Sequence, residues 1–457
     1  MNGKIDRRSL KENILNKGQK WSISNASLEE LWKKFTGVSP TSTSNFIFDG
    51  GDSFATLSFA ELLESESKPT TIIMEMLFHK TFQDLKSYVD TFEKPISILS
   101  MPSSPEENVK AKVARLDKSS YELKLLWKQN LEKCIDASPI LAKNDIILIG
   151  SHKGLFAAIN SSGKVLWSNY LDDRIESTAC SDGVNVFVGT YSGSFYRMKV
   201  SNGEIIWKNC DANDIIKSQA LLHSDAGKVV FGSHDGIVRC ISVETGQMIW
   251  SVKVQGSVAT ALVQFDANSF VCATLAGICY KIQMDGKIIW KVALDSPIFG
   301  RPICRGSKIL VTSVRGHFYK IDDNGSIQNT FRIGTNKHVF APLLNFNNTS
   351  TIVNTQEGDV FNFDDEGQVL WTQESSNPII SAGCAISRNE LFVIDKNSIL
   401  SVIHHESGHL LHRQDLRIAE TFSTPLCLTS GNNNVHCKIV IGSRDNHIYC
   451  FQMINTS

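Results

Sequence analysis

The sequence predicts a mainly β protein that carries a small α-helical domain near its N-terminus. Two patterns in the 457 residues indicate this division. Apolar residues recur with helical spacing between residues 21 and 92, whereas β-branched segments separated by glycine turns fill residues 121–457. Residues 93–120 contain Pro, Ser and a charged run, which is typical of a flexible linker. We therefore expect a four-helix bundle and a large all-β domain that fold separately.

The composition is that of an ordinary soluble globular chain. Lys+Arg 46 against Asp+Glu 47 gives a formal net charge of −1, so no basic field favours nucleic acid. No apolar run is long enough to span a bilayer, and the first residues lack the apolar core of a signal peptide. The 11 cysteines show no CxxC spacing, so we expect reduced thiols in a cytoplasmic protein.

The first segment, residues 1–20, contains the string Asn-Gly-Lys-Ile-Asp, which ends at Asp6. It resembles the last motif of adenylate-forming (AMP-binding) enzymes. In that family the lysine stabilises negative charge while a carboxylate attacks the α-phosphate of ATP, and Lys4 is the matching residue. No Gly-rich phosphate loop precedes it in this chain. We therefore expect the remnant of an adenylation domain, with Lys4 a catalytic residue separated from its site.

Four helices are expected in residues 21–92. Ser27 precedes an apolar helical pattern over residues 28–35, and Glu30 lies three positions after Ser27, which predicts a capping box. Gly37 is expected to end this helix. Further helices are expected from the serine at position 53 to about residue 66, over 72–78 and over 81–89.

The loop before the second helix contains the motif Gly50-Gly51-Asp52-Ser53. Paired glycines allow a tight turn, and a serine hydroxyl at the positive end of a helix suits a phosphodiester. The motif and its helix order resemble phosphopantetheine carrier domains, although that family usually has leucine where this chain has Asp49. The resemblance implies that Ser53 carries 4'-phosphopantetheine and that a phosphopantetheinyl transferase is a partner. The alternative is an ordinary loop whose serine caps the helix.

Residues 121–457 contain an internal repeat, Gly-x-φ-φ-Trp, in which φ is aliphatic or Met. Full copies end at Trp167, Trp207, Trp250, Trp290 and Trp371. Degenerate copies end at Trp127, Asn329 and His412, and all copies together give a mean period of about 41 residues. Tight turns are expected upstream at Gly154, Gly193, Gly236, Gly277, Gly316, Gly358, Asn397 and Asn446.

The repeat predicts a β-propeller of eight four-stranded blades, with seven blades as the alternative. The last unit lacks an outer strand, and residues 123–127 resemble such a strand without its blade. The N-terminal strand is therefore expected to complete the last blade and close the ring. The pattern resembles the PQQ-like repeat of quinoproteins, in which the tryptophans pack between neighbouring blades.

Neither quinone chemistry nor a metal site is expected in the propeller. Quinoprotein dehydrogenases use two adjacent cysteines, a calcium site and a catalytic aspartate, and this chain has no adjacent cysteines and no Asp-rich loop. PQQ is therefore not an expected cofactor. A group of neighbouring residues has side chains that could bind zinc, namely His404, His405, Glu406, His409 and His412. Because strand neighbours face opposite sides, we interpret it as a solvated hairpin without metal.

The order of adenylation remnant, carrier domain and propeller resembles the C-terminal part of the beta-alanine-activating enzymes, also called aminoadipate-semialdehyde dehydrogenases. The resemblance implies an ATP-dependent parent that activates an amino or carboxylic acid and loads it on the arm of Ser53. The adenylation domain would lie in the full-length enzyme, and the propeller would recognise a protein or acceptor substrate. Two alternatives remain open, a non-catalytic binding scaffold and a PQQ-dependent dehydrogenase. Whether this chain alone is an enzyme is left open.

Overall fold

The computed structural model shows two compact units, Met1–Glu106 and Glu107–Ser457. It describes residues 27–47, 49, 51, 53–64, 70–90, 121–223, 226–335, 337–346, 348–374, 377–385, 387, 389–429 and 436–455. Lys4 and the predicted linker therefore lie outside the described residues. Within the described ranges, no helix has both the length and the apolar character to cross a membrane.

Four helices form the described part of the first unit, as the apolar spacing predicts. They are α2 (Leu28–Thr36), α3 (Ser53–Leu63), α4 (Thr70–His79) and α5 (Phe82–Asp90). Ser27 Oγ accepts the backbone N–H of Glu30, and Glu30 Oε2 accepts that of Ser27, so the predicted capping box is confirmed. Gly37 ends α2 in the left-handed conformation with φ 79°.

Aromatic rings form the centre of the helical unit. The buried indole of Trp32 meets Phe46 and Phe82 edge-on, with ring centroids 5.1 Å apart in each pair. Phe59 of α3 lies 5.3 Å from Phe46, so the loop before α3 packs into the same core as the helices. Edge-on geometry of this kind contributes beyond the apolar area that it buries.

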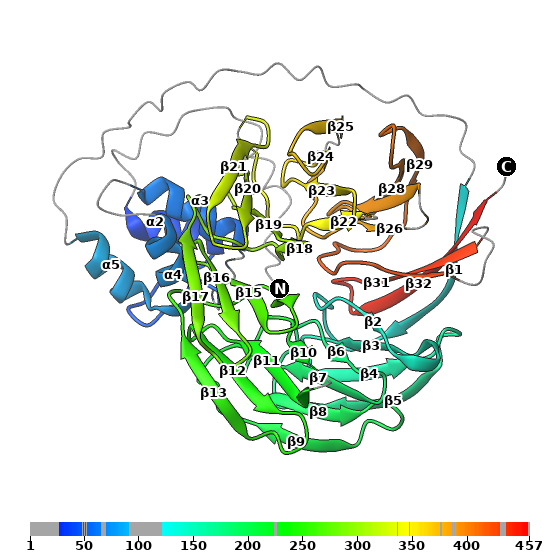
Figure 1. The fold of residues 1–457 in the computed structure, drawn as a ribbon, viewed down its shortest axis with the longest axis horizontal. Coiled ribbons are helices and arrows are strands. Elements are labelled where there is room, and N and C mark those ends of the chain that lie inside the picture. Colours follow the sequence, from blue (N-terminus) through cyan, green and yellow to red (C-terminus); the bar gives the residue numbers. More distant parts are fainter. Residues whose placement is uncertain are drawn as a thin grey trace, which may run out of the picture. The chain divides into compact units, whose positions relative to one another are not determined.

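The second unit consists of eight four-stranded antiparallel sheets, which confirms the eight-bladed propeller and excludes the seven-bladed alternative. Figure 1 shows the sheets arranged in a ring. The first three blades in chain order contain β2 (Ile140–Leu141), β3 (Ile147–Gly150), β4 (Leu155–Ile159), β5 (Val165–Tyr170); β6 (Cys180–Ser181), β7 (Asn185–Gly189), β8 (Phe195–Lys199), β9 (Ile205–Asn209); β10 (Leu221–His223), β11 (Lys228–Gly232), β12 (Ile237–Ser242) and β13 (Met248–Lys253). A short 3-10 turn, η2 (Lys143–Asp145), separates β2 from β3.

Five further blades complete the ring. Four of them contain β14 (Val263–Asp266), β15 (Ser269–Ala273), β16 (Ile278–Gln283), β17 (Ile288–Ala293); β18 (Ile303–Arg305), β19 (Lys308–Thr312), β20 (His317–Asp322), β21 (Ile327–Arg332); β22 (Leu344–Phe346), β23 (Ser350–Asn354), β24 (Val360–Phe363), β25 (Val369–Gln373); β26 (Cys384–Ala385), β27 (Glu390–Ile394), β28 (Ile399–His404) and β29 (Leu410–Asp415). The eighth contains β30 (Leu426–Thr429), β31 (His436–Gly442), β32 (His447–Asn455) and β1 (Tyr121–Asn130).

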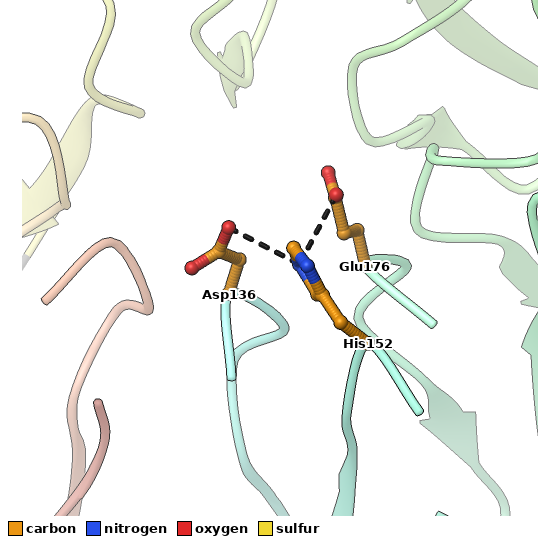
Figure 2. Close-up of side chains that lie close together, drawn as sticks. All are labelled: Asp136, His152 and Glu176. Atoms are coloured by element: carbon orange, nitrogen blue, oxygen red, sulfur yellow. Dashed lines mark ion pairs between the residues drawn. The ribbon is translucent and has the colours of Figure 1, made fainter. Parts of the chain in front are cut away.

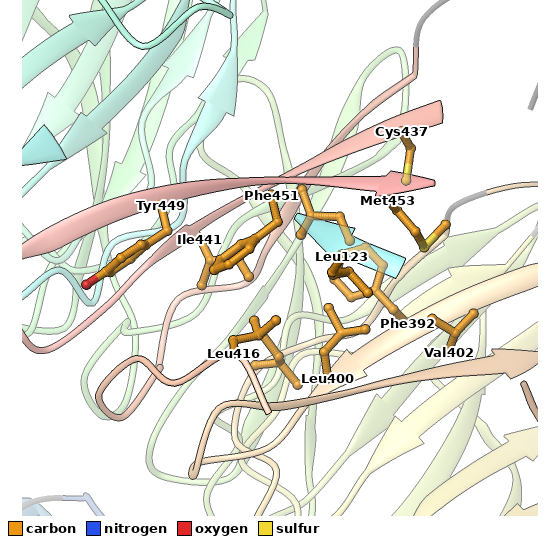
Figure 3. Close-up of a cluster of buried hydrophobic side chains, with 12 residues drawn as sticks. Leu123, Phe392, Leu400, Val402, Leu416, Cys437, Ile441, Tyr449, Phe451 and Met453 are labelled. Atoms are coloured by element: carbon orange, nitrogen blue, oxygen red, sulfur yellow. The ribbon is translucent and has the colours of Figure 1, made fainter. Parts of the chain in front are cut away.

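The eighth blade is assembled from both ends of the unit, as predicted. β1 pairs antiparallel with β32 in a register that runs from Tyr121 opposite Asn455 to Asn130 opposite His447. Leu123 thereby enters a buried cluster with side chains of β27, β28, β31 and β32 (Figure 3). An open ring would leave β32 as an exposed strand edge, and this pairing removes it.

Tryptophans join neighbouring blades, which confirms their predicted structural role. Trp167 packs on Gly203 of the next blade, and its indole N–H donates to the carbonyl oxygen of Val200 at 2.8 Å. Equivalent bonds to the following blade come from Trp127, Trp207, Trp250, Trp290 and Trp371. In all eight blades the register of the outer strand shifts next to the tryptophan or to the residue that replaces it. The residue before each tryptophan is thereby turned outward.

Two details differ from the sequence analysis. The left-handed residue of the seventh turn is Ser398, with φ 64°, and not Asn397, because Ser398 takes the place that Gly154 takes in the first blade. His405 does not belong to a solvated hairpin, since it is buried, stacks on Phe346 with centroids 3.8 Å apart and contacts Ser350 Oγ at 2.6 Å. Burial lowers the pKa of His405, which therefore behaves as a core residue.

Candidate functional site

The loop that leads into α3 is held by its own backbone. The carbonyl oxygen of Asn45 accepts the N–H of Asp49 at 2.9 Å, and its side-chain oxygen accepts the N–H of Ile47 at 3.1 Å. The carbonyl oxygen of Phe46 accepts the N–H of Gly51 at 2.8 Å. These bonds fold the segment back on itself immediately before Ser53, the first residue of α3.

Gly51 is required by the close approach of the loop to Phe46. A Cβ at position 51 would lie 2.8 Å from the carbonyl oxygen of Phe46 and would overlap its ring. Phe46 is fully buried and cannot move away. The structure therefore explains the predicted glycine at position 51, whereas Gly50, Asp52 and the side chain of Ser53 lie outside what it describes.

Asp49, where this chain departs from the usual leucine, has a partner of its own. Its Oδ2 accepts the indole N–H of Trp32 at 3.0 Å. Trp32 is 1% exposed, so without this acceptor its N–H would be buried unpaired. The carboxylate thus links the loop to α2.

Asp49→Ala is expected to lower the free energy of unfolding of the helical unit by about 1–3 kcal/mol, because the buried indole N–H loses its acceptor. Urea unfolding followed by helical circular dichroism measures this. Glu75→Ala, at an exposed site of α4, is the control and should stay within about 0.5 kcal/mol of the parent. Equal effects of the two substitutions would show that the Trp32 contact contributes nothing.

A second candidate site lies on one face of the propeller. Figure 2 shows Asp136, His152 and Glu176 pointing toward one another from three different segments. Asp136 lies in the loop from β1 to β2, His152 in the turn between β3 and β4, and Glu176 in the loop from β5 to β6. His152 Nε2 is 3.2 Å from Asp136 Oδ2 and 3.1 Å from Glu176 Oε1.

Cations surround the two carboxylates. Arg444 of the eighth blade donates to Asp136 through Nε at 3.0 Å and through Nη2 at 2.7 Å. Lys217 Nζ lies 3.0 Å from Glu176 Oε2, and Arg174 Nε lies 3.6 Å from Glu176 Oε1. The side chains of Asp136 and His152 are each 11% exposed, and that of Glu176 is 8% exposed. Most of this charge is therefore shielded from water.

These contacts control the protonation of the cluster. Burial alone would lower the pKa of His152, but contacts with Asp136, Cys134 and Glu176 raise it to about 11. Burial would raise the pKa of Glu176, but Lys217, His152 and Arg174 hold it well below its ordinary value. The site therefore contains an imidazolium between two carboxylates at neutral pH.

The three residues also have the types and spacing of metal ligands, since their ligand atoms all lie within 4.8 Å of one another. The sequence analysis expected no metal, and charge favours the same conclusion. Both oxygens of Asp136 already accept from Arg444, and Glu176 is paired with two further cations. A divalent ion would have to displace them. The arrangement is better suited to holding a proton on His152.

The propeller region is recognised by its similarity to a known family. The family description "Beta-alanine-activating enzyme, beta-propeller" matches residues 131–453. The chain belongs to the beta-alanine-activating enzyme family. The match covers the whole ring apart from β1 and the last residues of β32. It therefore includes the charged cluster, which consists of Asp136, His152, Arg174, Glu176, Lys217 and Arg444.

Individual members of the beta-alanine-activating enzyme family match parts of the chain. The enzyme of Drosophila melanogaster is 26% identical over 244 residues, which cover 51% of this chain and 24% of the relative. The human enzyme is 39% identical over 87 residues, which cover 17% of this chain and 8% of the relative. The aligned part thus spans at most about a quarter of these relatives. The crystal structure of BamB from Moraxella catarrhalis has the same fold, with a TM-score of 0.58 at 17% identity over 72% of this chain and 97% of that chain.

Sequence reasoning missed the charged cluster of this family member. Its residues are separated by up to 308 positions, since Asp136 pairs with Arg444. One signal was available, because His152 and Arg444 both follow a serine that comes directly after the second strand of its blade. Aligning the blades on that serine would have placed both side chains around one face of the ring.

Proposed function

We propose that the chain is the carrier and propeller portion of an ATP-dependent acid-activating enzyme. Ser53 would take 4'-phosphopantetheine, whose thiol would hold the activated amino or carboxylic acid as a thioester. The propeller would recognise the acceptor or a partner protein. An adenylation domain elsewhere in the full-length enzyme would supply the activated acid, and a cytoplasmic phosphopantetheinyl transferase would attach the arm.

The observation that carries this proposal is the loop before α3. Its backbone folds tightly at Gly51, where only glycine fits, and α3 begins two residues later at Ser53. The first turn of α3 contains no acidic residue, so the positive end of the helix is not neutralised within that turn. Such an end favours the negative charge of a phosphodiester. Membership of an acid-activating family agrees with a carrier at this place.

The arm would carry the acyl group from the site that activates it to the site that uses it. A thioester held on a flexible arm reaches the next site at a high effective concentration, because the second encounter becomes intramolecular. The carrier and propeller would accept and deliver the acyl group, and the adenylation domain of the full-length enzyme would make the adenylate. Lys4 would then act only in the full-length enzyme.

The rim of the propeller supports a role in recognition. Adjacent apolar residues are exposed in pairs on the outer strands, at Leu125 and Leu126, Val165 and Leu166, Ile205 and Ile206, and Met248 and Ile249. Contiguous exposed apolar surface often marks a site of contact with other proteins, and we assign these pairs to such a surface. A PQQ-dependent dehydrogenase is the less supported alternative, because the sequence has no adjacent cysteine pair.

Phosphopantetheine attachment tests the proposal. The full chain is incubated with a broad-specificity phosphopantetheinyl transferase, coenzyme A and Mg²⁺, and its intact mass is measured. We expect the parent to gain one phosphopantetheine and Ser53→Ala to gain none. Ser58→Ala, in the same helix, is the matched control and should be modified like the parent. An unmodified parent that is folded would favour the binding scaffold instead.

A further inference from the structure

The propeller repeat places a cysteine beside His152. In each blade, the second residue after the second strand donates its backbone N–H to a carbonyl in the preceding interblade loop. The eight donor and acceptor pairs are His152 and Cys134, Tyr191 and Arg174, His234 and Ile215, Leu275 and Ser257, Val314 and Pro297, Gln356 and His338, Lys396 and Pro378, and Arg444 and Glu420. The repeat thus holds two side chains next to each other in every blade. The first blade alone combines a thiol with an imidazole at this place.

The side chains of this pair are in contact. Cys134 Sγ lies 3.6 Å from His152 Nδ1, on the side of the ring opposite the carboxylates. His152 Nε2 faces Asp136 and Glu176, so it must carry a proton for these contacts to be attractive. The remaining proton is therefore shared along the axis between Nδ1 and Sγ. A thiol, a base and a carboxylate that orients the base form the constellation of nucleophilic catalysis.

The surrounding charges favour the ionic form of the pair. The contact with His152 lowers the pKa of Cys134 against the opposing effect of burial, and Arg444 lowers it further while Asp136 raises it. Arg444 is also subject to the charge of Glu420 on the adjacent loop. Cys134 is only partly buried, so we expect a small reagent to reach its sulfur. Reactive cysteines are typically found in such electropositive, partly exposed surroundings.

We propose that Cys134 is a nucleophile that accepts an acyl group from a thioester, with His152 as its base. The thiolate attacks the thioester carbonyl, a new carbon–sulfur bond forms to Cys134, and the carbon–sulfur bond to the donor thiol breaks. The leaving thiolate takes the proton from His152 Nδ1, so the products are an acyl-Cys134 thioester and a free thiol. The choice of a thioester as donor rests on the proposed function of Ser53.

A small thioester tests the proposal without the carrier. The full chain with Ser53→Ala is incubated with S-acetyl-N-acetylcysteamine, and acetylated peptides are identified by mass spectrometry. We expect one acetyl group on Cys134, none there after Cys134→Ser, and no loss after Cys210→Ser, which changes an exposed cysteine. Acetylation spread over several cysteines, or none at Cys134, would overturn the proposal. Because Ser53 is absent, this failure is distinct from a failure of phosphopantetheine attachment.

A second readout needs no thioester. At pH 6 we expect iodoacetamide to alkylate Cys134 in the unaltered chain at least about tenfold faster than Cys210, because a thiolate paired with an imidazolium persists in mild acid. His152→Ala should remove this difference in a chain that retains its β circular dichroism. Equal rates at the two cysteines in the parent chain would show that Cys134 is an ordinary thiol.

Discussion

Leu123→Ala is expected to lower the free energy of unfolding of the propeller by about 2–5 kcal/mol, the usual cost of emptying a well-packed apolar site. Leu123 is 6% exposed and packs against the cluster that joins the seventh and eighth blades (Figure 3). It also lies on the strand that closes the ring, opposite Met453. A cavity there weakens both the blade interface and the closure.

The same strand supplies a matched control. Leu126 lies at the register shift of β1 and is 40% exposed, so Leu126→Ala should change the free energy of unfolding by no more than about 0.5 kcal/mol. Urea unfolding followed by tryptophan fluorescence compares the two variants. If both substitutions had the same small effect, β1 would not contribute to the closed ring in solution.

Glu176→Gln is expected to destabilise the propeller by about 3–5 kcal/mol, because it removes the buried carboxylate charge that pairs with the largely buried imidazolium of His152. The side chain of Glu176 is 8% exposed and lies against His152, Lys217 and Arg174. Glu366→Gln is the control, since Glu366 also pairs with two lysines but is 66% exposed. It should cost less than about 1 kcal/mol.

The lowered pKa of Glu176 predicts how the stability of the propeller depends on pH. The pKa of Glu176 is well below 4.5 in the folded protein, so its stabilising contribution is complete above the unfolded-state pKa. The contribution is lost as the pH falls through the folded-state value. The free energy of unfolding of the parent should therefore decrease below about pH 4.5, and that of Glu176→Gln should decrease less steeply. Parallel curves for the two proteins would contradict the depressed pKa.

The architecture of the propeller could be predicted because the same residue types recur at fixed positions of its repeat. Trp167 and its equivalents recur at one position of six of the eight blades, and the indole of each contacts the next blade. The incomplete units at the two ends of the region predicted the pairing of β1 with β32. The capping box of Ser27 and Glu30 was also predictable, because it depends only on local spacing.

The details that sequence reasoning missed depend on three-dimensional contacts that periodicity does not reveal. Ser398 occupies a left-handed position because the hairpin around it is fixed, although asparagine next to it has the higher preference. His405 is buried because Phe346 and Ser350 of the preceding blade cover it. Asp49 is tolerated because Trp32 donates to it across the loop. None of these partners is close in the sequence, so composition and periodicity could not show them.

The charged cluster was missed for the same reason. The proposed role of His152 comes from Cys134, Asp136 and Glu176 on two neighbouring loops. Pairing of a thiol with an imidazole across 18 residues depends on the backbone bond that the fold repeats in every blade. The pairing can be predicted only when the blades are aligned with one another.

The most direct measurement is the state of Ser53 in the chain isolated from cells that produce it naturally. Peptide-resolved mass spectrometry should show phosphopantetheine on the peptide that contains Ser53, in part with an acyl group on its thiol. That result would establish the carrier role, and the mass of the acyl group would identify the acid. A Ser53 peptide that is fully recovered and entirely unmodified would contradict the account and leave the propeller as a binding scaffold.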